Sequence, residues 1–128
     1  MLQPTEVIAV KLLPTIRARL AQTLLEAYGM KQIQVARALG LTQAAVSHYN
    51  TKSRGLDQDL LKRFPEIDGF VVLLAEKIHD GLPRTQQIAL INQFSFHLLN
   101  TQRFCEFHKK ISHIDPGCAV CFPTPPPP

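Results

Sequence analysis

Residues 31–55 read KQIQVARALGLTQAAVSHYNTKSRG, and this stretch decides the fold class. Residues 32–39 have the spacing of a short amphipathic helix, which Gly40 ends. The residues expected to face inward on it are Ile33, Val35, Ala36 and Leu39. Thr42 then offers a hydroxyl to cap a second helix over residues 43–50. Two helices of about eight residues with a Gly-Leu-Thr turn between them predict a helix-turn-helix.

The second helix of this pair has an unusual outer face. Ala36 is small where the two helices approach each other, and Val46 fills the space beneath the second helix. The residues left on the outer face are Gln43, Ala44, Ser47 and His48. Short and amide side chains can enter a DNA major groove, where Gln bonds adenine N6 and N7 and Ser bonds either base type. The pattern therefore favours DNA binding over plain helix packing.

The distribution of charge points the same way. The 128-residue chain has a net charge of +4, but residues 1–55 carry +5 and residues 56–128 carry −1. Lys52 and Arg54 lie in a loop directly after the second helix, where they are expected to meet backbone phosphates. Arg17 and Arg19 are interpreted as a solvated face of an earlier helix.

The 31–55 segment resembles the helix-turn-helix of the XRE, or phage-repressor-like, transcriptional regulators. The larger frame is similar to small archaeal and bacterial regulators, in which a proline-interrupted helix, here VKLLPTIRARLAQTLLEAYGM (residues 10–30), precedes the motif and a Cys/His-rich tail follows it. The resemblance implies that Gln32 contacts a phosphate and Gln43 reads a base. Lys31 stands where the family often has a Ser or Thr cap, and a lysine there can meet phosphate. The complete expected DNA-binding set is Gln32, Thr42, Gln43, Ala44, Ser47, His48, Lys52 and Arg54.

The rest of the chain predicts an all-α fold, because alternating β-branched residues are nearly absent. Residues 6–13 are apolar and could form a strand or a leading helix kinked at Pro14, and the helix is favoured. The other expected helices cover residues 14–28 closed by Gly29, 57–64 stopped by Pro65, 66–79, and one long helix from about 83–85 to about 110. Apolar residues lie on more than one side of that long helix, which favours a homodimer interface. The alternative is that the helix lies at the centre of the monomer.

Three cysteines fall within the last 24 positions, and with one histidine they form the pattern C-x2-H-x9-C-x2-C. The four candidate ligands are Cys105, His108, Cys118 and Cys121, with Asp115-Pro116-Gly117 as the returning turn. This set predicts a tetrahedral Cys3His site for zinc or for an iron-sulfur cluster. Zinc is slightly preferred, because the spacing of the ligands alone does not show how many iron atoms would be bound. His113 is a competing ligand with poorer spacing.

These features predict a helix-turn-helix domain (1–56), a helical connector and dimerisation region (57–104), a Cys3His segment (105–122) and a disordered proline-rich tail (123–128). We expect a cytoplasmic, dimeric regulator of transcription that binds operator DNA, with a metal or cluster that stabilises or switches it. Enzymatic activity and a small-molecule substrate are not expected, because phosphate loops, nucleophile elbows and carboxylate pairs are missing. No membrane contact is expected, since no apolar run approaches about 18 residues. The alternative function is a metal-stapled adaptor for protein partners.

Overall fold

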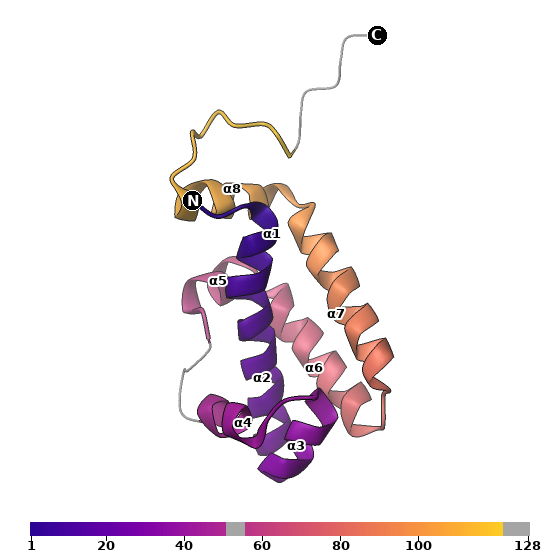
Figure 1. Cartoon of the computed structure of the whole chain (residues 1–128). Helices are drawn as coiled ribbons and strands as arrows, with labels where there is room; N and C mark the ends of the chain where they lie inside the picture. Colours follow the sequence, from indigo (N-terminus) through magenta and orange to yellow (C-terminus); the bar gives the residue numbers. More distant parts are fainter. Residues whose placement is uncertain (51–55, 122–128) are drawn as a thin grey trace.

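The computed structural model describes residues 1–50 and 56–121, and this part of the chain is helical without a β-strand. The helices are α1 (Pro4–Val7), the π-helical η1 (Ile8–Leu12), α2 (Leu13–Glu26), α3 (Gln32–Leu39), α4 (Gln43–Asn50), α5 (Gln58–Arg63), α6 (Glu66–His79), α7 (Arg84–Leu99) and α8 (Gln102–Ser112). The predicted all-α class is confirmed. Figure 1 shows α3 and α4 at one end of the molecule and α8 at the other, with α2, α6 and α7 running between them.

The N-terminal segment forms one continuous rod of α1, η1 and α2. Pro14 has no amide hydrogen to donate, and the turn before it widens so that the Leu13 amide donates to the Ile8 carbonyl, five residues back. A π-helical turn therefore precedes Pro14, where the sequence predicted a kink. The rod's buried side is Val7, Leu12, Ile16, Leu20 and Leu24, which forms the centre of the core.

The ends of α2 and α5 follow simple capping rules. α2 ends at Glu26, and the chain turns through Gly29 at φ 62°, with the Met30 amide donating to the Leu24 carbonyl at 3.1 Å. α5 begins where the Asp57 carboxylate accepts the Leu60 amide at 3.0 Å. The Asp57 amide in turn donates to the hydroxyl of the fully buried Thr15 at 3.2 Å, which fixes α5 against the rod.

The prediction of one long helix to about residue 110 is wrong. The chain forms α7 and α8, with a break at Asn100 and Thr101. The Asn100 amide group donates to the Phe96 carbonyl at 2.9 Å, and the Thr101 hydroxyl donates to the Leu98 carbonyl at 2.7 Å while it accepts the Phe104 amide at 3.2 Å. These side chains bond backbone groups that a continuous helix would use, so α7 ends and α8 is capped anew.

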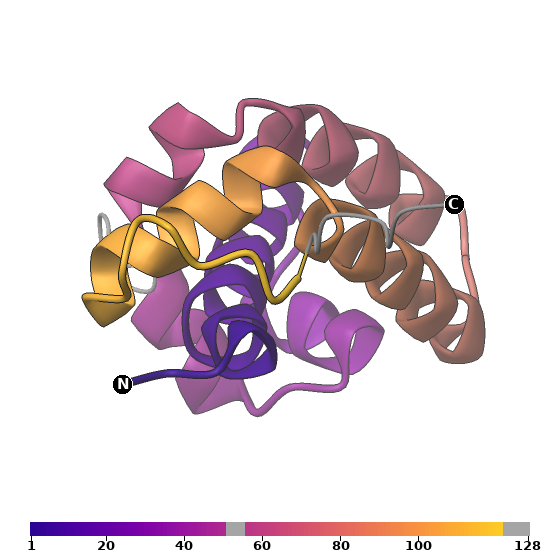
Figure 2. The same ribbon diagram turned by 90° about the horizontal axis from the view of Figure 1, so that it is seen from above.

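The break turns α8 across the end of the bundle, as the view from above shows (Figure 2). Phe104 and Phe107 of α8 are both buried and contact the ring of Phe64, with ring centroids 6.1 and 5.8 Å away. A straight helix would have carried these two phenylalanines away from Phe64. Burial of the three rings therefore favours the turned arrangement.

Candidate functional site

The pair α3 and α4 has the predicted ranges and the predicted turn between them. Gly40 takes φ 66°, and the Leu41 amide donates to the Ala36 carbonyl at 2.9 Å. The Thr42 hydroxyl accepts the Ala45 amide at 3.1 Å, so the expected cap of α4 is confirmed. Val46 is fully buried beneath α4. The expectation that Ile33 faces inward is wrong, because 45% of the surface of this residue is exposed.

The structure brings most of the expected DNA-binding residues onto one face. The exposed residues of this set are Thr42, Gln43, Ala44, Ser47 and His48, while Gln32 at the start of α3 is half-buried. The His48 ring meets the Tyr49 ring edge-on, with centroids 5.9 Å apart. Lys52 and Arg54 lie outside the described residues. The outer face of α4 therefore carries an amide, two small side chains and an imidazole.

The basic excess of the N-terminal half is partly neutralised by the rest of the chain. Lys11 pairs with Asp57 at 3.5 Å, and Arg19 pairs with Asp68 of α6 at 3.0 Å. Arg19 is therefore a tertiary contact rather than part of a purely solvated face. Lys31 and Arg37 are exposed on or beside α3, and no ion pair joins either of them to an acidic side chain within residues 1–50 and 56–121.

Three residues that the sequence analysis missed hold the ends of α3 and α4. The Gln22 side chain donates to the Tyr49 carbonyl at 3.0 Å. The Arg84 guanidinium donates to the carbonyl of Arg37, and the Gln87 amide group donates to that of Ala38 at 3.0 Å. The last carbonyls of a helix have no partner within it, and here they find donors from α2 and α7. No local pattern could have identified these donors, because they lie far away in the sequence.

The four expected metal ligands line one cavity of about 150 Å³ at the opposite end of the molecule. Its other walls come from the N-terminal segment, from α8 and from the tail after it, namely Met1, Leu2, Gln3, Pro4, Lys109, Ile114 and Val120. His113 is not among its lining residues; it ends α8 in the left-handed conformation at φ 53°. Within the described residues, no three His, Cys, Asp or Glu side chains lie close enough to hold one metal ion. The structure thus gathers the four donors without closing them into a coordination shell.

Hydrogen bonds fix the surroundings of this cavity. His108 Nε2 lies 2.7 Å from the Leu2 carbonyl oxygen, to which the Ser112 hydroxyl also donates at 3.3 Å. The largely buried Lys109 ammonium donates to the Pro116 carbonyl at 3.0 Å and so holds the returning turn. The turn itself has the expected form, with the Cys118 amide donating to the Asp115 carbonyl at 2.9 Å.

The Cys105 thiol differs from the other two because it is buried. Burial raises its pKa, and the neighbouring Cys121 and Cys118 thiols add to the rise while the Lys109 ammonium opposes it. In the metal-free protein Cys105 is therefore held as the neutral thiol. A metal ion that binds here must displace that proton.

Comparisons with models of protein families, with curated proteins and with solved structures found no match to this chain. No helix among the described residues has both the length and the apolar character needed to cross a membrane.

Proposed function

We propose that the protein is a DNA-binding regulator of transcription that reads the major groove with α4. The observation that carries this proposal is the exposed outer face of α4, where Gln43, Ala44, Ser47 and His48 stand on a short helix pair with a Gly40 turn. No Asp or Glu occurs between Glu26 and Asp57 in the sequence. A face without carboxylates can approach phosphates closely, and its amide and hydroxyl groups suit base edges.

Basic groups on α3 and beside the Gly40 turn support the proposal. Lys31 precedes α3 and Arg37 lies on it. The fold adds Arg84 from α7, because its guanidinium bonds the Arg37 carbonyl and lies within 3.5 Å of where a Cβ on Gly40 would be. Contacts from such groups to phosphates would set the position of α4 in the groove.

A homodimer remains part of the proposal. α7 has 16 residues, of which only Gln87, Ser95 and Leu98 are buried, while Ile88 is 67% and Phe96 53% exposed. α6 adds the exposed pair Val72 and Leu73. Burial of these large apolar side chains against a second copy would lower the free energy of the protein, because it removes apolar surface from water. A dimer would also place two α4 helices on successive half-sites, about one DNA turn apart.

We further propose that Cys105, His108, Cys118 and Cys121 hold zinc or an iron-sulfur cluster. The shared cavity and the soft donor set support it, since three thiolates and an imidazole suit either group. The segment from Ile114 to Cys121 would have to move toward α8 to complete the shell. The bound group would then tie this tail to α8 and to the N-terminal segment of the rod.

The DNA proposal is tested by selecting sequences from random duplexes with the full chain and measuring affinities by fluorescence anisotropy. We expect Gln43→Ala to lose discrimination at one base pair, at about 1–3 kcal/mol, and exposed Gln86→Ala on α7 to change nothing. If Gln43→Ala leaves affinity for every sequence unchanged, base reading by α4 is wrong. If wild type binds duplex DNA without a salt dependence, or not at all, the adaptor alternative is favoured.

The metal proposal is tested by purification without oxygen, followed by a visible spectrum and metal analysis. A colourless protein with one zinc per chain supports a structural role and excludes the redox-switch version. A brown protein with iron and sulfide supports the cluster. If the purified protein contains neither zinc nor iron after growth with both metals, the proposed metal site is contradicted.

A further inference from the structure

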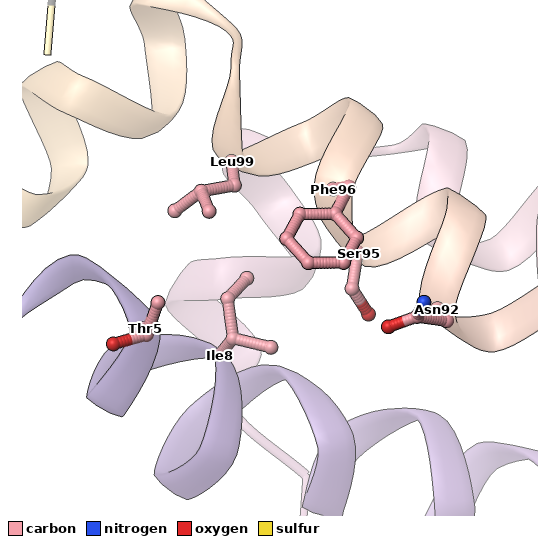
Figure 3. A pocket seen from close by; sticks show the side chains of 6 residues that line it. All are labelled: Thr5, Ile8, Asn92, Ser95, Phe96 and Leu99. Atoms are coloured by element: carbon pink, nitrogen blue, oxygen red, sulfur yellow. The ribbon is translucent and has the colours of Figure 1, made fainter.

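A groove between α7 and the N-terminal rod lies away from α4 and from the cavity that the cysteines line. Its walls include Ile88 and Phe96, which also belong to the proposed dimer surface. It begins as a cavity of about 90 Å³ lined by Thr5, Ile8, Asn92, Ser95, Phe96 and Leu99, whose side chains face each other across the gap between the two elements (Figure 3). A second, more open cavity of about 250 Å³ continues it and is lined by Ile8, Leu13, Arg17, Ile88, Ile91, Asn92 and Ser95. The two share Ile8, Asn92 and Ser95, so they are adjacent parts of one groove between α7 and the rod.

The middle of this groove holds a polar group that lacks a partner. Ser95 is 93% buried, since only 7% of its surface is exposed, and its Oγ is without a hydrogen-bond partner among the residues that the structure describes. A buried hydroxyl in this state is costly, and natural proteins retain few of them. Asn92 lies one helical turn before it and lines both cavities, so an amide and a hydroxyl face the same space.

A positive charge lies at the open end. Arg17 is exposed, lines the second cavity, and forms no ion pair with an acidic side chain in the described ranges 1–50 and 56–121. The remaining walls are mostly apolar, from Ile8, Leu13, Ile88, Ile91, Phe96 and Leu99. A cation, an amide and a hydroxyl above apolar walls are complementary to an anionic head on an apolar body.

We propose that this groove binds a small aliphatic monocarboxylic acid. Its carboxylate would accept hydrogen bonds from the Ser95 hydroxyl, the Asn92 amide and the Arg17 guanidinium, and its apolar body would enter the cavity between Ile8 and Phe96. The inner cavity of about 90 Å³ is smaller than the roughly 150 Å³ that holds benzene in a protein core, which favours a short alkyl chain over an aromatic ring. Ile8 also begins the π-helical turn, a feature that is frequent at functional sites. The proposal is independent of DNA binding.

The test is a titration of the full, isotopically labelled chain with hexanoate, hexan-1-ol and hexylamine, followed by NMR. We expect hexanoate to shift the signals of Ile8, Ser95 and Phe96, and hexylamine to shift none of them. Arg17→Gln should weaken hexanoate binding about tenfold, as loss of a charge-assisted hydrogen bond predicts, while Lys77→Gln on the exposed side of α6 should not. Ser95→Ala should weaken it about fivefold without destabilising the free protein, because its hydroxyl has no partner to lose.

Three results would overturn the proposal. The first is the lack of any shift at these residues with millimolar hexanoate. The second is equal binding of hexan-1-ol and hexanoate in both wild type and Arg17→Gln, which would make the groove a neutral apolar cavity. The third is a dimer that Phe96→Asp dissociates, with no hexanoate binding in either protein, which would make the groove a contact between two copies.

Discussion

The side chain of Gln87 is hydrogen-bonded to the carbonyl of Ala38, at 3.0 Å, across 49 positions of sequence. The same amide group donates to the Leu82 carbonyl at 3.1 Å, so both of its hydrogens are used. Gln87 is buried in the first turn of α7, and Ala38 lies in the last turn of α3. α3 has only eight residues and gains little stability from its own hydrogen bonds. Its C-terminal end is therefore held by α7.

Replacing Gln87 tests this link. We expect Gln87→Leu to lower the free energy of unfolding by about 1–3 kcal/mol, because two partly buried carbonyls lose their donor. Urea denaturation followed by circular dichroism measures the change. The matched control is Gln86→Leu, which alters an exposed neighbour on the same turn and should shift stability by less than about 0.5 kcal/mol. Equal stability of the two variants would mean that α7 does not hold α3.

The break between α7 and α8 leads to a second prediction. Thr101→Ala removes the hydroxyl that accepts the Phe104 amide and donates to the Leu98 carbonyl, and should cost about 1–2 kcal/mol. Thr101→Ser keeps the hydroxyl and should retain most of the stability. Thermal unfolding of the three proteins gives the comparison. A Thr101→Ala protein as stable as wild type would show that the cap does not determine the break.

Local signals determined what the sequence could predict. α6 has the predicted range Glu66–His79 because Pro65 and Gly81 bound it, and α3 and α4 have theirs because Gly40 and Thr42 act on adjacent residues. The break at Thr101 was missed because the apolar pattern continues across it. The helix split depends on burial of Phe104 and Phe107 against Phe64, which is a tertiary effect.

In the candidate site too, local signals separate the residues that could be predicted from those that could not. The outer face of α4 could be predicted because helical period alone separates Gln43 and Ser47 from the buried Val46. The roles of Gln22, Arg84 and Gln87 could not, since their partners are backbone carbonyls 27 to 49 positions away. The pairing of Arg19 with Asp68 could not be predicted for the same reason. It changes which basic side chains are available to contact DNA phosphates.

This difference among the cations gives a third prediction for DNA binding. Each phosphate contact that is lost should reduce the slope of log affinity against log salt by about 0.9. We expect Lys31→Gln and Arg37→Gln each to reduce the slope by up to this amount, with little change in sequence preference. Arg19→Gln is the control, because its guanidinium is bound to Asp68 and its slope should stay as in wild type. Equal slopes for all four proteins would remove α3 from the interface.

The buried thiol gives a fourth prediction, on pH. Burial raises the pKa of Cys105 in the folded chain, whereas an unfolded thiol ionises near pH 8.5. The folded state therefore holds this proton more tightly. Stability from this group is complete below about pH 8.5 and is lost as the pH rises through the folded pKa. Urea denaturation of metal-free, reduced protein at about pH 7.5 and about pH 9.5 measures this loss. Between the two pH values, the free energy of unfolding should fall more for wild type than for Cys105→Ala. Equal falls would contradict the raised pKa.

His113 and His108 can be separated by one pair of substitutions. His113 ends α8 at φ 53°, a conformation that costs a residue with a Cβ about 1 kcal/mol and glycine little. His113→Gly should therefore stabilise the metal-free protein by about 0.5–1 kcal/mol, and His113→Ala, which keeps the strain, should not. Neither should change zinc affinity, because His113 lies outside the cavity that the three cysteines line. His108→Gln should weaken zinc at least about tenfold, since it removes a ligand from that cavity. Competition with a chromogenic chelator measures these affinities. Loss of zinc in His113→Ala with retention in His108→Gln would transfer the fourth ligand to His113 and require the tail to fold back over the end of α8.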